Sequence, residues 1–376
     1  MKKILWSLFG LVMVFAIASH IYSYVFSNII SLSPQNGGKK CNAFLDKKDL
    51  TTVRILVIDG GGIDGVMPLV LLRYLEEKTG KPIVDLFDFF TGTSTGSIIV
   101  SSLNVPDDDG KPRYSAGKLL EIYTDFSKEV LAPSVTREIL TLHGLIGPHL
   151  SIQHSHTEFL RFLGDKITFG ALLKKVAITV YDIERNYPEI LNSWECDEAI
   201  SRYLLADVIT AATATPTFFA PAIFTDYHHR TRNVLVDGGI FTNNPSLDGI
   251  REALALYPHA SRFLIVHLGT GGGSLANLNL KADKIQHWGF LHWLRSILSI
   301  VYKSQNTVIR DAISSIQYFS ASKKFDYYYF NKNMKNAAPF DTTKANIDTI
   351  EAHARAIITE QGQTLDKVAQ ELLDAS

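Results

Sequence analysis

Ser94 has the glycine spacing that is typical of a serine nucleophile. It is the central residue of a Gly-x-Ser-x-Gly pattern that consists of Gly92, Thr93, Ser94, Thr95 and Gly96. An apolar run at residues 86–90 precedes the pattern, and a run with helical character at 97–103 follows it. A sharp turn between a strand and a helix lifts the serine hydroxyl clear of the sheet, at the positive end of the helix dipole. Because backbone segments nearly touch in such a turn, its flanking positions favour glycine. The pattern therefore predicts a nucleophile for acyl transfer.

A second glycine-rich turn consists of Gly60, Gly61 and Gly62. It follows a β-rich run at residues 53–58 and precedes apolar residues with helical spacing, which end at Gly80. A strand, a glycine loop and a helix in this order leave backbone N–H groups that point into a cavity. Such a loop could bind a phosphate, or it could bind the oxyanion of an acyl-transfer intermediate.

The same loop also matches the dinucleotide fingerprint. Gly60, Gly62 and Gly65 have the spacing Gly-x-Gly-x-x-Gly, and Asp85 is an acidic residue at the expected distance. However, Asp59 would place a carboxylate next to the pyrophosphate, and the segment before Asp85 is short and contains a proline. Nucleotide binding is therefore the less favoured alternative.

Asp237 is a carboxylate at the beginning of a tight turn. It follows the β-rich run at 233–236 and is the first residue of an Asp-Gly-Gly motif with Gly238 and Gly239. Sites in α/β proteins gather at the carboxyl ends of parallel strands. Asn244 and Pro245 then fit the N-cap and first turn of a helix. We expect Asp237 at the edge of the sheet where a site can form.

The remaining runs predict a mainly parallel sheet. Strands that alternate with helices over some 220 residues favour a sheet covered on both faces. We expect further strands at 176–182, 189–194, 262–268 and 327–330, and helices at 119–130, 199–214 and 287–303. The apolar, turn-rich run at 215–221 suits an acyl pocket, and an ordinary core turn fits it equally well. For the amphipathic helix at 287–303, core packing is favoured over contact with a lipid surface.

Composition excludes several classes of protein. The 376 residues are 46% hydrophobic and 20% charged, and the net charge is −1, which argues against a nucleic-acid-binding protein. Cys41 and Cys196 are too few for a disulfide framework, although one bridge could form in an oxidising compartment. Four histidines between 143 and 156 lie in a loop-like stretch without carboxylate or cysteine partners, so no metal site is predicted.

The N-terminal residues differ from the rest of the chain. Two lysines precede a long apolar stretch, so residues 1–32 fit a cleaved signal peptide or an uncleaved membrane anchor. Either one predicts a secreted, periplasmic or membrane-anchored protein. Residues 33–50 fit a linker, and 51–376 a catalytic domain with its motifs at 53–273 and an extension at 274–376.

Together these motifs resemble the patatin-like lipid acyl hydrolases, in particular the plant-patatin type. The matching stretches occur in the order typical of that family, namely 59–65, 87–96, 211–220, 237–245, 268–271 and 288–293. The resemblance implies a three-layer α/β/α sandwich around a mainly parallel sheet. It also implies a carboxylic ester hydrolase, a phospholipase A or acylglycerol lipase, with a lipid substrate at a membrane surface and no cofactor or metal. It makes no prediction of the oligomeric state.

The resemblance also implies the roles of individual residues. Ser94 attacks the ester carbonyl to form an acyl-enzyme, and Asp237 is the base of a Ser–Asp dyad. Gly60, Gly61 and Gly62 donate N–H groups to the oxyanion. A Ser–His–Asp triad with His267 is the alternative within this class, although a strand histidine is more often a core residue. A membrane-anchored lipid-binding protein without turnover is the alternative outside it.

The chain departs from the family pattern at two positions. Asp64 stands where the glycine loop usually has Arg or Lys, which removes a cation that could contact an anionic head group. Ser97 stands where the plant type usually has another glycine, and it is expected to be tolerated at the start of the helix.

Overall fold

A computed structural model provides the fold. It describes residues 50–132, 134–141, 147–194, 199–225, 232–272, 289–334 and 338–375, together with residues 10, 12–14, 17, 30–32, 286 and 287. Most of the expected N-terminal segment, most of the linker, and both cysteines therefore lie outside the described residues. No helix among the described residues is long and apolar enough to cross a membrane. The localisation and the boundaries expected for the N-terminal segment stay predictions.

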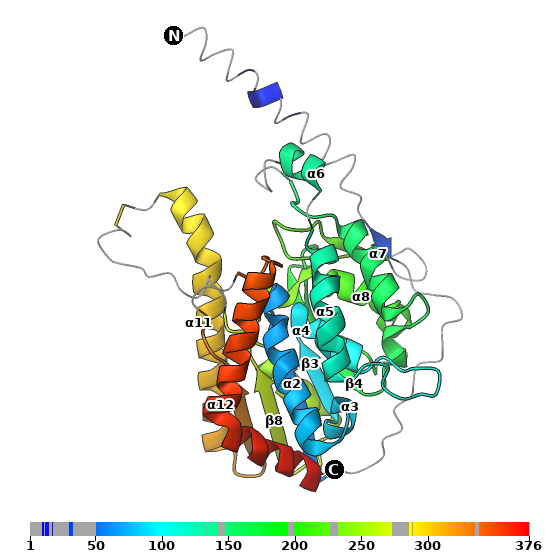
Figure 1. Cartoon of the computed structure of the whole chain (residues 1–376), viewed down its shortest axis with the longest axis vertical. Helices are drawn as coiled ribbons and strands as arrows, with labels where there is room; N and C mark the ends of the chain where they lie inside the picture. The colour runs from blue at the N-terminus through cyan, green and yellow to red at the C-terminus, as the bar shows by residue number, and fades with distance from the viewer. Residues whose placement is uncertain are drawn as a thin grey trace.

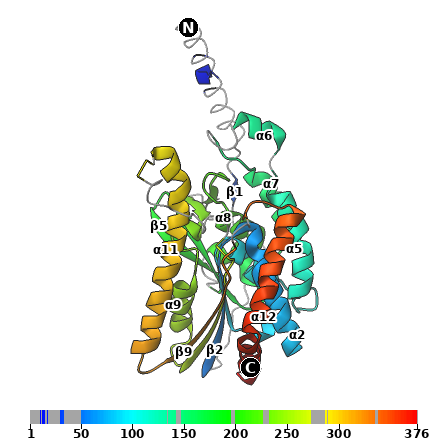
Figure 2. The ribbon, with the colours of Figure 1, turned by 60° about the vertical axis from the view of Figure 1, so that its left-hand side comes forward.

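Nine strands of the described residues form one sheet (Figures 1 and 2). Their order is β1-β6-β7-β4-β3-β2-β8-β9, and β5 pairs with β4. The pairs along β4-β3-β2-β8-β9 are parallel, whereas β7 is antiparallel to both of its neighbours. The strands are β1 Ser31–Leu32, β2 Thr52–Ile58, β3 Phe89–Gly92, β4 Lys175–Asp182, β5 Tyr187–Asn192, β6 Ala222–Thr225, β7 Arg232–Asp237, β8 Arg262–Leu268 and β9 Lys324–Phe330.

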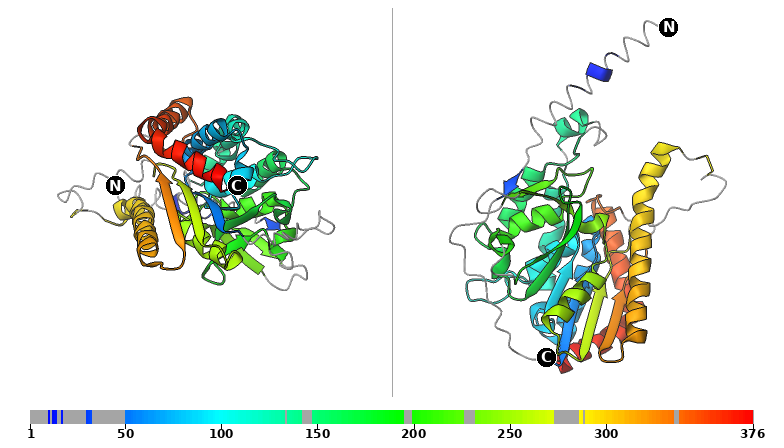
Figure 3. Two further views of the ribbon diagram at one scale, coloured as in Figure 1. Left: turned by 90° about the horizontal axis from the view of Figure 1, so that it is seen from below. Right: turned by 180° about the vertical axis from the view of Figure 1, so that it is seen from behind.

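Helices cover both faces of this sheet. Figure 2 shows α9 and α11 on one side and α2, α5 and α12 on the other, and Figure 3 shows the same layers end-on. The helices are α2 Val66–Thr79, α3 Ile83–Leu86, α4 Thr95–Leu103, α5 Ala116–Val130, α6 Val135–Leu140, α7 Ile152–Leu163, α8 Leu205–Ala212, α9 Ser246–Leu256, α11 Phe290–Phe319 and α12 Lys344–Asp374. The predicted three-layer α/β/α sandwich with a mainly parallel sheet is confirmed.

Alternation along the central strand β2 explains why two cores form. Val53, Ile55 and Val57 face α9 and belong to the smaller core. Leu56 and Ile58 face α2 and α4 and belong to the larger one. A strand that is apolar on both faces must be covered on both faces, which is the case for the central strand of a parallel sheet.

Three expected elements differ from the structure. The apolar run at 86–90 is only partly a strand, because α3 ends at Leu86 and β3 begins at Phe89. The helix expected at 199–214 is split into a 3-10 turn, Ala199–Arg202, and α8. The second half of the histidine-rich stretch is helical, because α7 begins at Ile152 and Ser151 caps it by accepting a hydrogen bond from the His154 N–H.

Candidate active site

Ser94 lies at the turn between β3 and α4, as expected for a nucleophile. Its φ of 51° and ψ of −118° are uncommon for a residue with a side chain. A Cβ at Gly92 would lie 2.3 Å from the carbonyl carbon of Gly96, and one at Gly96 would lie 2.1 Å from the carbonyl oxygen of Ile58. The two glycines are therefore needed for close contact between backbone segments.

Neighbouring hydroxyl groups hold this turn in place. The Thr93 hydroxyl is fully buried, donates to the Thr242 carbonyl at 2.9 Å, and lies 2.8 Å from the Thr179 hydroxyl of β4. The Ser97 hydroxyl donates to the Gly92 carbonyl at 2.9 Å. Serine is thus accommodated at position 97 because its hydroxyl has a partner within the turn.

Asp237 reaches the same site from β7, a strand that runs antiparallel to β4 and therefore opposite to β3. The expectation of a parallel strand was wrong, because β7 is antiparallel to β4. In the sheet Gly92 pairs with Ile178, whereas Asp237 pairs with Val180, two residues further along β4. Since β7 runs back along the protruding end of β4, its last residue arrives just beyond the end of β3, beside the nucleophile turn.

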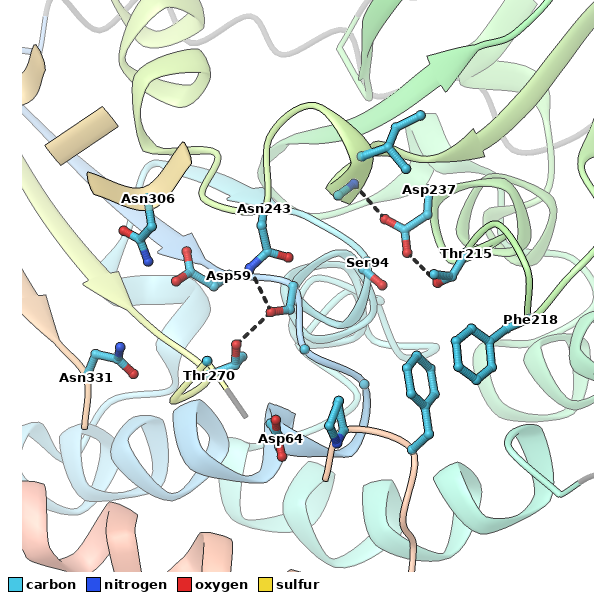
Figure 4. A pocket seen from close by; sticks show the side chains of 18 of the residues that line it. Asp59, Asp64, Ser94, Thr215, Phe218, Asp237, Asn243, Thr270, Asn306 and Asn331 are labelled. Atoms are coloured by element: carbon cyan, nitrogen blue, oxygen red, sulfur yellow. Dashed lines mark hydrogen bonds between the residues drawn. The ribbon is translucent and has the colours of Figure 1, made fainter. Parts of the chain in front are cut away.

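The Asp237 carboxyl is 3% exposed and accepts two hydrogen bonds from fixed donors. The Gly239 N–H donates to Oδ1 and the Thr215 hydroxyl to Oδ2, both at 2.8 Å (Figure 4). Burial raises the pKa of this carboxyl, and hydrogen bonding by Ser94, Gly239 and Thr215 partly opposes that increase. A carboxylate with a raised pKa is a stronger base than one in water. A Cβ at Gly238 would lie 2.4 Å from the Thr179 hydroxyl oxygen, which explains the first glycine of the motif.

The glycine loop lies opposite Asp237, but its three N–H groups are not equivalent. The Gly60 N–H donates to the Asn243 carbonyl at 3.0 Å, so the expectation that it binds the oxyanion was wrong. No backbone acceptor among the described residues takes the N–H of Gly61 or Gly62, and both glycines line the cavity. They remain the candidate oxyanion donors.

Hydrogen bonds to its carbonyl groups fix the loop. The Gly60 carbonyl accepts from Thr270 at 2.6 Å and from the Asn243 amide at 3.1 Å (Figure 4). At the other end, Thr95 and Tyr123 donate to the Gly62 carbonyl at 2.6 and 2.8 Å. Donors held from both sides need little reorganisation when charge develops on the substrate.

The nucleophile, the carboxylate and the loop line one cavity of about 490 Å³. Its two ends differ in chemistry. Phe218 and Phe340, which stack with ring centroids 3.9 Å apart, form an apolar end. Asn306, Asn331 and other polar residues line the opposite end, and Ser94 lies between the two in Figure 4. The run at 215–221, whose composition fitted a pocket and an ordinary core turn equally well, contributes Thr215, Pro216, Thr217 and Phe218 to the lining.

His267 is buried beneath this cavity and cannot serve as the base in this arrangement. Its Nε2 lies 2.5 Å from the Asp59 carboxylate and its Nδ1 lies 2.6 Å from the Tyr327 hydroxyl. Both ring nitrogens are therefore occupied within the core. Burial raises the pKa of Asp59, whereas His267 lowers it. The geometry favours the core role of His267 over the triad.

Asp64 lies in the 3-10 turn after the glycine loop and lines the cavity. It is 1% exposed, and no hydrogen-bond partner for its Oδ1 is found among the described residues. Burial therefore raises its pKa well above the ordinary value. Burial thus disfavours the charged form of this carboxyl.

The sequence analysis assigned no role to several residues of the site. Thr270 and Asn243 contact Gly60 from 210 and 183 positions away, and Thr215 contacts Asp237 from 22 positions away. The glycine-rich turn after β8 and the Asn-Asn pair after the Asp-Gly-Gly motif could have indicated the first two. Asn306 and Arg310 come from the part of α11 that lies beyond the helix expected at 287–303.

Comparisons with known proteins agree with the resemblance of the motifs. The family model for patatin-like phospholipase matches residues 56–248. Patatin-like protein 2 from Arabidopsis thaliana is 31% identical over 270 residues, which cover 64% of this chain and 65% of that protein. Patatin-like protein 2 from Oryza sativa subsp. indica is 28% identical, with coverages of 64% and 66%. The chain thus spans just under two thirds of the length of these relatives. Human GIVD cytosolic phospholipase A2 is a similar structure, with a TM-score of 0.48, 10% identity, and coverage of 89% of this chain and 62% of that one.

Proposed function

The chain belongs to the patatin-like phospholipase family, and we propose that it is a lipid acyl hydrolase that works through a Ser94–Asp237 dyad. The observation that carries this proposal is the placement of a strained serine and a buried carboxylate in one cavity with an aromatic end. The strained turn exposes the hydroxyl, and the dry surroundings make the carboxylate basic.

In the proposed reaction Asp237 takes the proton of the Ser94 hydroxyl while the serine oxygen attacks the ester carbonyl. The N–H groups of Gly61 and Gly62 stabilise the resulting oxyanion. The bond to the alcohol then breaks, the alcohol leaves with the proton from Asp237, and an acyl-enzyme remains. Water, deprotonated by Asp237, attacks the acyl-enzyme and releases the fatty acid, which restores Ser94.

The apolar end of the cavity suits the acyl chain. The stacked rings of Phe218 and Phe340 offer a flat apolar surface, and Ile240 also lines the cavity. Covering an acyl chain contributes about 0.8 kcal/mol for each buried methylene. The site therefore favours esters of long-chain acids over those of short ones.

Exposed apolar side chains support contact with a lipid surface. Val135 and Ile139 of α6, and Ile297 and Ile300 of α11, are exposed. Figure 1 shows α6 and the first half of α11 beyond the same end of the sheet, the end at which β3 meets the nucleophile turn. Apolar side chains on projecting helices can enter the interface of a membrane.

The test is fatty-acid release from mixed phospholipid and acylglycerol micelles. We expect release by the parent protein and background rates for Ser94→Ala and Asp237→Asn. Activity that survives Asp237→Asn but not Ser94→Ala would show another base. Micelle binding by a folded parent protein without release would support a lipid-binding protein that lacks turnover, and would contradict the proposal.

A further inference from the structure

The polar end of the cavity is built by α11. Gln305 attaches this helix to the site, because its amide nitrogen donates to the Ile240 carbonyl at 3.2 Å and its oxygen accepts from the Asn243 N–H at 3.3 Å. Asn306 and Arg310 lie one helical turn apart, so both face the cavity and both line it. The attachment next to the Asp-Gly-Gly turn thus fixes where Arg310 lies relative to the dyad.

Arg310 rests on an aromatic platform. Its guanidinium carbon lies 4.7 Å from the centre of the Tyr329 ring. That ring stacks on the His267 ring, with 4.4 Å between the two ring centroids. The Tyr329 hydroxyl accepts from the amides of Asn331 at 2.8 Å and Asn306 at 3.3 Å. A guanidinium that stacks on a fixed ring keeps its N–H groups free at the edge of the plane.

No ion pair between described residues occupies Arg310. The acidic groups that line the same cavity are Asp59, Asp64 and Asp237. Asp59 is bonded to His267, Asp237 is bonded to Thr215 and Gly239, and burial raises the pKa of all three. The charge of Arg310 acts on Asp59 and helps to lower its pKa, but no carboxylate among the described residues forms an ion pair with the guanidinium at the polar end.

We propose that Arg310 and Asn306 form a subsite for the phosphodiester of a glycerophospholipid whose acyl chain lies against Phe218 and Phe340. The proposal rests on the proposed function, since it places the ester between these two ends, at Ser94. A guanidinium binds a phosphate through two parallel hydrogen bonds, which a neutral diacylglycerol cannot form. Arg310 would thus supply the cation that Asp64 removes from the glycine loop.

Binding to the inactive Ser94→Ala protein tests this subsite without turnover. Isothermal titration calorimetry would compare dihexanoyl phosphatidylglycerol with dihexanoylglycerol, both below their aggregation limits. We expect the phospholipid to bind about tenfold more tightly, which corresponds to about 1.4 kcal/mol. With the added Arg310→Gln change, the two lipids should bind equally tightly. With Arg310→Lys, part of the preference for the phospholipid should remain because the positive charge remains. Arg251→Gln removes the same charge from an exposed side chain of α9 and should leave the ratio unchanged.

Three results would overturn the subsite. These are an unchanged ratio in Arg310→Gln, an equal loss for both lipids, and inorganic phosphate that binds as tightly as the phospholipid. The last result would indicate a general anion site and not a head-group site. Fatty-acid release by the parent protein is measured separately. A ratio that depends on Arg310 in a protein without fatty-acid release would refute the hydrolase and retain the subsite. Release by the parent protein, together with a ratio that does not depend on Arg310, would support the hydrolase and refute the subsite.

Discussion

Removing the hydroxyl of Thr215 should shift the pH dependence of the proposed hydrolase. This hydroxyl donates to Asp237 Oδ2 at 2.8 Å, and the Gly239 N–H donates to Oδ1 at the same distance. Both bonds favour the ionised carboxylate, whereas burial disfavours it and is the larger effect. Thr215→Val keeps the shape of the side chain and removes one of the donors.

The size of the shift follows from the strength of that bond. A hydrogen bond to a charged group contributes about 1.5–3 kcal/mol. The neutral carboxyl keeps part of it, because it can still bond the hydroxyl, so we take about 1.4 kcal/mol as the difference between the two forms. This raises the pKa of Asp237 by about one pH unit. Since the base works only when ionised, kcat/KM falls as the pH falls through this pKa, and the acid limb of Thr215→Val should lie about one pH unit higher.

Hydrolysis of a soluble p-nitrophenyl ester between pH 4 and 9 measures this limb. Well below both pKa values the variant should be about tenfold slower than the parent, and well above them the two should converge. Thr213→Val is the matched control, because the Thr213 hydroxyl donates to the Ile209 carbonyl and not to Asp237. An acid limb that is unchanged in Thr215→Val, or shifted equally in Thr213→Val, would refute a general-base role for Asp237.

Three further changes test the turn, the buried base and the glycine loop. Gly96→Ala places a Cβ 2.1 Å from the Ile58 carbonyl oxygen and should destabilise the protein by about 2 kcal/mol or more in chemical unfolding, whereas Gly117→Ala within α5 has room and should stabilise it by about 0.5–1 kcal/mol. Asp237→Asn should raise the melting temperature by about 2 °C at pH 7. The raised pKa of Asp237 means that the folded protein binds more protons than the unfolded chain, so stability is lost as the pH rises toward that pKa, and the advantage of Asn should disappear near pH 4 and below. Because burial disfavours the charged form of Asp64, Asp64→Asn should keep kcat within about twofold at pH 7, and a large change in kcat would mean that the charged carboxyl takes part in turnover.

Local patterns were sufficient to predict the parts of the site that depend on close backbone contact. The nucleophile turn, the glycine loop and the end of β7 each require glycine at particular positions, and those glycines are visible in the sequence. The strands around them are short, apolar and bounded by turns, so their positions could also be predicted. The glycines are visible in the sequence even where the atoms that they avoid, such as the Ile58 carbonyl oxygen next to Gly96, are distant in the chain.

The direction of β7 and the hydrogen-bond acceptor of the Gly60 N–H could not be predicted in this way. A short buried strand has the same pattern whether its neighbour is parallel or antiparallel, so Asp237 was expected on a parallel strand. The partner of the Gly60 N–H is a carbonyl 183 positions away, at Asn243, and only the folded chain brings the two together. His267 likewise gave no sign of its partners, because Asp59 follows β2 and Tyr327 lies within β9, both far from His267 in the sequence.

The position of charge around the glycine loop explains why an acidic residue can replace a basic one there. An ionised Asp64 next to Gly61 and Gly62 would oppose the developing oxyanion and weaken the donors on which the proposed reaction depends. Burial opposes this, because it raises the pKa of the carboxyl and so disfavours its charged form. Among the described residues that line the cavity, the cationic side chain is that of Arg310, which stacks on Tyr329 at the polar end. If Arg310 binds the head group as proposed, the loop stabilises the oxyanion with backbone N–H groups alone, and recognition of the substrate's charge is moved to α11.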